Sequence, residues 1–115
     1  MGIGDKISKA IKEGKWLRIS YINKNRDNTF YWIAIKDVDY KTKNLKVVIF
    51  NEKKSMDTFE SRILFDNIKS AEVMDFTSYE VPQGLLDKIE NNLSKFSWLN
   101  YDHFSHNVLN YFNEC

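Results

Sequence analysis

Apolar and polar positions alternate along much of the chain with the two-residue period of half-buried β-strands. In the segment 15–22, Leu17, Ile19 and Tyr21 share one face, which we predict to face the core. The segment 30–38 is apolar on both faces, so we place it centrally in a sheet. Further runs of β-branched and aromatic residues predict strands at 45–50, 59–65 and 68–74. Short strands at this spacing favour a small antiparallel barrel or sandwich, because curling protects the sheet edges.

A short helix is predicted before the strands. Ile7, Ala10 and Ile11 fall on one helical face, and Asp5 can serve as the N-cap. Gly14 stands where a left-handed residue ends a helix. We therefore expect a helix from Asp5 to Gly14 that packs as a lid on the sheet.

Two helices are predicted after the strands. Pro82 is suited to the first turn of one of them. Its apolar stripe consists of Leu85, Leu86, Ile89 and Leu93. The second is predicted from Asp102 to about Phe112, and the sequence stops directly afterwards at Cys115. Because no glycine, proline or polar tail follows, we expect the chain to be the N-terminal segment of a longer protein.

Composition narrows the class of protein. Of the 115 residues, 43% are hydrophobic and 29% are charged, which is typical of one globular domain. No apolar run reaches the roughly 18 residues of a membrane span, and the N-terminus lacks an apolar signal-peptide segment. The single cysteine, Cys115, cannot form an internal disulfide. We expect a soluble, cytoplasmic protein without a membrane partner.

The net charge of +1 conceals an asymmetry between the two halves. Residues 1–62 carry 14 Lys and Arg against 8 Asp and Glu, whereas residues 63–115 carry 3 against 8. Such an asymmetry can indicate a polyanion bound to the basic half. It can equally mean that the two halves attract each other in the folded protein.

Neither catalysis nor metal binding is indicated. The only histidines, His103 and His106, lie three residues apart on the predicted last helix, and no third ligand follows at a suitable spacing. The four glycines match no phosphate-binding pattern. We expect no catalytic residue, metal or cofactor in this segment. An ATPase or helicase domain of a longer protein would lie outside it.

Two segments resemble the WYL domain, a small Sm/SH3-like barrel of bacterial regulators. Residues 10–21, Ala-Ile-Lys-Glu-Gly-Lys-Trp-Leu-Arg-Ile-Ser-Tyr, are similar to its opening helix, glycine and basic strand. Residues 63–73 are similar to its closing strand and bend. The family's Trp-Tyr-Leu run would fall at 45–47, where neither aromatic is present, and its closing arginine is Asn67 here. The resemblance therefore implies the fold but not the family's own ligand site.

The same resemblance implies a function. WYL-like domains sense nucleic acids or nucleotides and regulate attached domains. More loosely, a small barrel followed by acidic helices resembles the start of bacterial superfamily I helicase-like proteins. The resemblance thus implies an accessory or regulatory domain of a larger nucleic-acid-handling protein.

These inferences combine into one expected architecture. The fold class is α+β: a small five-stranded antiparallel SH3/Sm-like barrel, preceded by a short helix and followed by two C-terminal helices. Residues 1–76 would form the barrel with its N-terminal helix. Residues 77–115 would form a helical extension that packs on the barrel or on a missing downstream domain.

A basic, aromatic strand face is the candidate binding site. Proteins that bind single strands place aromatic rings beside positive charges, because bases stack on the rings and phosphates attract Lys and Arg. The residues expected to bind single- or double-stranded nucleic acid or a nucleotide-type ligand are Trp16, Arg18, Lys24, Arg26, Trp32, Lys36 and Arg62. The alternative is that the tryptophans pack in the core and the cations only solvate the sheet.

The aromatic C-terminal region supports a second hypothesis, a protein-interaction or dimerisation module. The expected partner-binding residues are Trp98, Tyr101, Phe104 and Phe112. Their partner would be the rest of a longer chain or a second copy in a homodimer. The alternative is that they pack back on the barrel.

Overall fold

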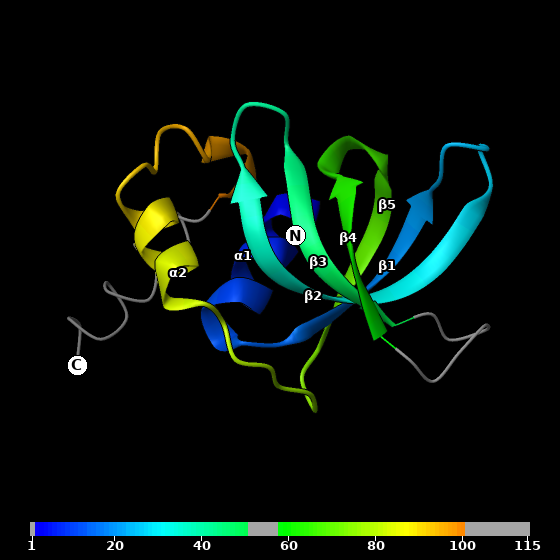
Figure 1. The fold of residues 1–115 in the computed structure, drawn as a ribbon, viewed down its shortest axis with the longest axis horizontal. Helices are drawn as coiled ribbons and strands as arrows, with labels where there is room; N and C mark the ends of the chain where they lie inside the picture. The colour runs from blue at the N-terminus through cyan, green and yellow to red at the C-terminus, as the bar shows by residue number, and fades with distance from the viewer. Residues whose placement is uncertain (1, 51–57, 101–115) are drawn as a thin grey trace.

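A curled antiparallel sheet of five strands forms the centre of the computed structural model, which describes residues 2–50 and 58–100 (Figure 1). The elements in chain order are α1 (Ile3–Glu13), β1 (Trp16–Ile22), β2 (Asn28–Asp39), β3 (Asn44–Phe50), β4 (Thr58–Leu64), β5 (Ile68–Met74) and α2 (Gln83–Glu90). Two short 3-10 turns lie at Phe65–Asn67 and Ser97–Leu99. None of the described helices has the length and apolar character needed to cross a membrane.

The sheet is open, so the predicted closed SH3/Sm-like barrel is wrong. The strand order is β4-β3-β2-β1-β5, with β4 and β5 at the two edges and no ladder between them. At the end of β4, the Leu64 N–H donates to the Tyr21 hydroxyl of β1, at 3.0 Å. The sheet therefore curls strongly but does not close.

Of the two predicted C-terminal helices, the structure describes only the first, which is shorter than expected. Within residues 58–100, α2 is the single α-helix after the sheet, and it ends at Glu90. Leu93, the last position of the predicted stripe, lies beyond it. The Asn92 amide donates to the Lys88 carbonyl, at 2.8 Å, because short polar side chains compete for backbone groups near helix ends. The helix predicted at 102–112 lies outside the described residues.

Helix α1 agrees with the sequence except at its start. Gly2, and not Asp5, is the N-cap, and the Asp5 carboxylate accepts the Gly2 N–H at 3.0 Å. Gly14 ends the helix with φ of 66°, in the left-handed region that glycine adopts without steric cost. The predicted face of the helix is buried in the core.

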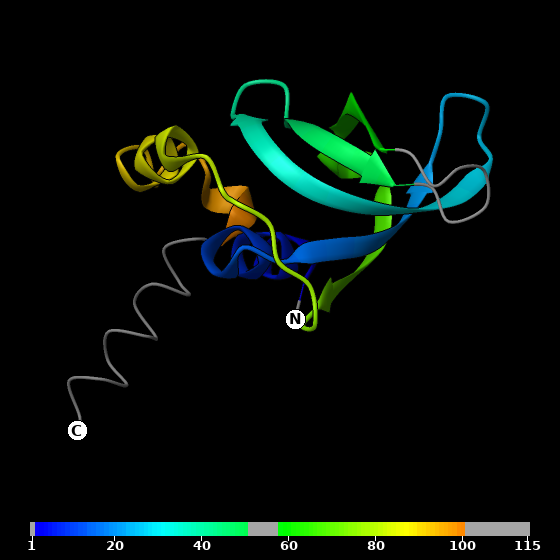
Figure 2. The same ribbon diagram turned by 60° about the horizontal axis from the view of Figure 1, so that its bottom comes forward.

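The core lies inside the curl of the sheet. Leu17, Ile19 and Tyr21 are buried there, as their alternation predicts. Leu85 and Ile89 of α2 are buried in the same cluster. In both views α2 and the β1–β2 hairpin lie at opposite ends of the molecule (Figure 2). The inner face of the sheet is therefore used for packing.

Candidate functional site

A row of side chains crosses the outer face of the sheet. Cross-strand pairing sets Trp32 of β2 opposite Phe50 of β3 on one side and opposite Arg18 of β1 on the other. Thr58 of β4 lies opposite Phe50. Trp16 precedes Arg18 by two residues and so shares its face. Pairing between three strands thus gathers Trp16, Trp32 and Phe50, which lie far apart in the sequence.

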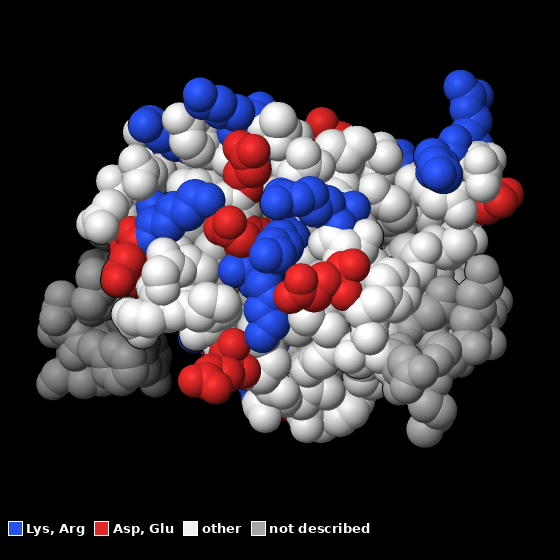
Figure 3. Space-filling model, viewed as in Figure 1, with Lys and Arg blue, Asp and Glu red and all other residues white. Residues whose placement is uncertain are grey.

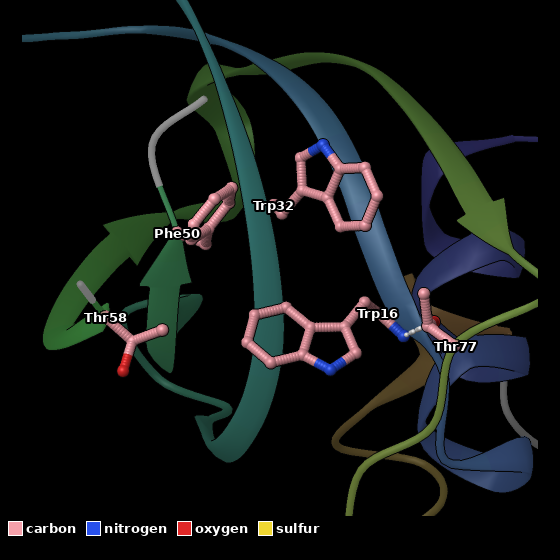
Figure 4. A pocket seen from close by; sticks show the side chains of 5 residues that line it. All are labelled: Trp16, Trp32, Phe50, Thr58 and Thr77. Carbon is pink, nitrogen blue, oxygen red and sulfur yellow. Dashed lines mark hydrogen bonds between the residues drawn. The ribbon is translucent and has the colours of Figure 1, made fainter. Parts of the chain in front are cut away.

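These residues line a pocket of about 240 Å³. Its walls are Trp16, Trp32, Phe50, Thr58 and Thr77. Figure 4 shows the two indoles side by side, with Phe50 and Thr58 on one side and Thr77 on the other. The volume is below that of typical pockets for drug-sized ligands. The aromatic pocket therefore suits one ring system or one side chain.

Edge-to-face contacts hold the rings of the aromatic pocket. The Trp32 ring centroid lies 6.3 Å from that of Phe50 and 5.9 Å from that of Phe76. The Trp16 centroid lies 6.5 Å from that of Tyr79. These separations are within the range of favourable aromatic pairs. Phe76 is 77% exposed, so an aromatic surface extends outward from the pocket.

The segment after β5 fixes one side of the pocket. The backbone N–H of Trp16 donates to the Thr77 hydroxyl, at 3.0 Å, and that hydroxyl donates to the Met74 carbonyl, at 2.7 Å. The Tyr79 hydroxyl donates to the Ile35 carbonyl, at 2.7 Å. Burial raises the pKa of Tyr79 well above its usual value, so the hydroxyl stays protonated and remains a donor. The segment is thereby tied to both β1 and β2.

Two of the predicted cations lie beside this aromatic surface. The Arg18 guanidinium carbon is 4.8 Å from the centroid of the Phe30 ring. The Lys36 ammonium is 5.1 Å from the centroid of the Tyr79 ring. Both geometries are typical of cation–π contacts. Glu72 of β5 lies opposite Arg18, so the charge around the pocket is mixed.

The other predicted cations lie elsewhere. Lys24 and Arg26 are exposed in the β1–β2 hairpin, at least six residues from Arg18, which is roughly 20 Å along a strand. Arg62 is opposite Lys46, four residues along β4 from Thr58. In Figure 3 charges of both signs alternate over the middle of the molecule, and a basic group stands apart on the hairpin. The structure therefore groups Trp16, Arg18, Trp32 and Lys36, and separates the rest.

Of the predicted partner-binding residues, Trp98 is the one within the described range. It is half-buried, and its ring centroid lies 4.8 Å from that of Phe65. The Ser8 hydroxyl of α1 donates to the carbonyl of Leu99, the next residue. This part of the C-terminal region thus packs back on the domain. Tyr101, Phe104 and Phe112 lie outside the described residues.

The lining of the aromatic pocket consists of three aromatic and two threonine side chains. Among the described residues no three His, Cys, Asp or Glu side chains gather as metal ligands do. His103 and His106 lie outside that range. The pocket itself presents rings and hydroxyl groups, which can stack and donate hydrogen bonds but supply no nucleophile with a base beside it.

Sequence reasoning missed Phe50, Phe76, Thr77 and Tyr79. Phe50 had a signal, because alternation from Lys46 places it on the outer face of its strand. The other three lie in an irregular segment without periodicity, and only the tertiary structure brings them to the pocket.

Comparisons of the chain with protein-family models, curated proteins and solved structures find no match. The resemblance to WYL domains therefore stays a prediction.

Proposed function

We propose that this domain is a non-catalytic module that binds single-stranded nucleic acid, with a base held in the aromatic pocket. The observation that supports the proposal is the pair of half-buried indoles, Trp16 and Trp32, side by side on the outer face of the sheet. The wider role we propose is that of an accessory domain in a larger nucleic-acid-handling protein.

Stacking supplies the main attraction in this proposal. Each base stacked on an aromatic side chain contributes about 1–3 kcal/mol of binding free energy, whichever of the bases it is. The pocket has space for one ring system, and the exposed Phe76 ring extends the surface for a neighbouring base. Thr58 brings a hydroxyl group to the rim, where it can hydrogen-bond to the edge of a base.

Single strands fit this site better than duplexes. In a duplex the bases are stacked on each other and must be flipped out at a cost of a few kcal/mol before they can enter a pocket. A single strand offers its bases without that cost. We therefore expect clear preference for single-stranded over double-stranded DNA of the same sequence.

The charge at the site limits how strongly affinity depends on salt. Arg18 and Lys36 are the predicted cations beside the aromatic surface. Two phosphate contacts on a single strand give a slope of about −1.4 in a plot of log affinity against log salt concentration. A steep slope, typical of extended basic surfaces, is not expected.

Fluorescence anisotropy of a labelled oligothymidylate tests the proposal. Trp32→Ala should weaken binding about 5- to 150-fold, which corresponds to the loss of one stacked base. The matched control is Trp98→Phe, which changes the indole packed against Phe65 and should leave affinity unchanged. Equal affinities for Trp32→Ala and the wild type, or no binding by the wild type, would rule out this function.

A further inference from the structure

Strand β4 forms one open edge of the sheet. The strand order ends at β4, and Glu60 and Arg62 are exposed on it. Phe59, on the same strand, is 53% exposed. An edge of this kind presents unpaired backbone groups and is a template for another strand.

The backbone hydrogen bonds show which residues face the open side. Phe65 donates its N–H to the Lys43 carbonyl, toward β3, whereas Leu64 donates its N–H to Tyr21, away from β3. Antiparallel strands alternate between these two directions. The N–H and C=O groups of Glu60 and Arg62 therefore point outward, and within the described part of the chain no backbone group pairs with them there.

We propose that a second copy of this chain pairs its β4 with this edge, antiparallel, about a two-fold axis through Ser61. In this register Glu60 lies opposite Arg62 of the partner subunit, and Arg62 lies opposite Glu60 of the partner subunit. Both are outward-facing positions, so the two residues of each pair exchange backbone hydrogen bonds. The five-stranded sheets of the two subunits would then join at β4 into one continuous sheet.

The charges of β4 favour this register over others. Edge strands commonly carry charges that repel an identical strand. Here the sequence Glu60-Ser61-Arg62 is complementary to itself when it is reversed. Arg62 already lies opposite Lys46 within the subunit, an unfavourable pair of like charges. The partner's Glu60 would add a carboxylate on the other side of Arg62.

Apolar surface also becomes covered in this dimer. The side chain of Phe59 points to the inner face of the sheet, opposite Ile49. In the proposed register it lies opposite Ile63 of the partner subunit. An aromatic ring opposite a β-branched residue is a favourable cross-strand pair, and it would shield a ring that is half exposed in the single subunit.

Charge reversal combined with mixing tests the register. Glu60→Lys places two positive charges opposite each other in both pairs, and Arg62→Glu places two negative charges there. Each variant should raise the dimer dissociation constant roughly 10- to 30-fold in sedimentation velocity. Mixed in equal amounts, the two variants should restore a dimer, because each pair is then again of opposite charge. Circular dichroism should show both variants folded, since the two side chains are exposed.

Several outcomes would overturn the proposal. These are a monomeric wild type at high protein concentration, a variant that still dimerises as the wild type does, and mixing that restores nothing. Rings or longer assemblies would instead indicate that β4 pairs with β5 of the next copy, a head-to-tail contact that the mixed variants would not restore.

A disulfide at the axis gives a second, independent readout. Ser61 would lie opposite Ser61 of the partner subunit in a pair without backbone hydrogen bonds, where Cα atoms are about 4.5 Å apart, within disulfide range. Ser61→Cys, made together with Cys115→Ser, should form a covalent dimer on oxidation. Thr58→Cys in the same background is the matched control and should not. Equal cross-linking of both would contradict the register.

Discussion

At the scale of single residues, Tyr79 connects several parts of the aromatic pocket. Its hydroxyl donates a hydrogen bond to the Ile35 carbonyl, and its ring lies beside both Trp16 and Lys36. Burial is the largest cause of its raised pKa, and the hydrogen bond to Ile35 only partly offsets it. One side chain therefore links the segment after β5, the pocket and a cation.

Removing the Tyr79 hydroxyl should lower stability in a pH-dependent way. Tyr79→Phe should cost about 1 kcal/mol at pH 8, because the Ile35 carbonyl loses its donor. The pKa of Tyr79 in the folded state is raised above the unfolded value of about 10. The stability that the hydroxyl contributes is therefore complete below pH 10 and is lost as the pH rises further. Urea unfolding at pH 8 and at about pH 11 measures the free energy of unfolding, and the difference in this free energy between wild type and variant should be smaller at the higher pH. A constant difference would contradict the assigned environment.

At the scale of elements, the strands could be predicted closely and their ends less so. Each predicted strand lies within two residues of an observed one, because runs of β-branched and aromatic residues mark the strands. In the first strand, alternation of apolar side chains also specifies the buried face. The end of α2 could not be predicted from the sequence. Leu93 continued the apolar period, but Asn91 and Asn92 favour local hydrogen bonds over helix.

The 3-10 turn at Ser97–Leu99 lies so close to α1 that only glycine fits between them. A Cβ atom at Gly4 would clash with the Trp98 carbonyl oxygen. Gly4→Ala should therefore destabilise the fold by about 1–3 kcal/mol, the usual cost of overpacking. The measurement is the midpoint of urea unfolding.

Gly84 in α2 provides the matched control for that substitution. A Cβ atom there meets nothing within 4 Å. Gly84→Ala should be neutral or stabilise by up to about 1 kcal/mol through helix propensity. Equal effects of the two substitutions would show that the turn does not pack on α1 as described.

At the scale of the whole molecule, the open sheet separates a packed inner face from an outer face that carries the aromatic pocket. From the sequence, Trp16 and Arg18 share one face of the first strand, and Trp32 and Lys36 share one face of the second. Their grouping depends on the register between β1 and β2 and on the segment after β5. The hairpin cations are separate because Lys24 and Arg26 lie beyond the end of β1.

This separation makes the cations distinguishable by experiment. Arg18→Ala should reduce the salt slope of single-strand binding by about 0.7, the contribution of one phosphate contact. The double variant Lys24→Ala and Arg26→Ala removes two exposed cations of the hairpin and should leave the slope unchanged. If the hairpin variant lowers the slope and Arg18→Ala does not, the strand binds elsewhere.

The most direct test of the aromatic pocket follows the three indole N–H signals by NMR during titration with an oligothymidylate. The chain contains three tryptophans, of which two line the pocket and Trp98 packs against Phe65. We expect the signals of Trp16 and Trp32 to shift together and saturate, while that of Trp98 stays in place. A shift confined to Trp98, or none in the two pocket signals, would contradict the proposed site.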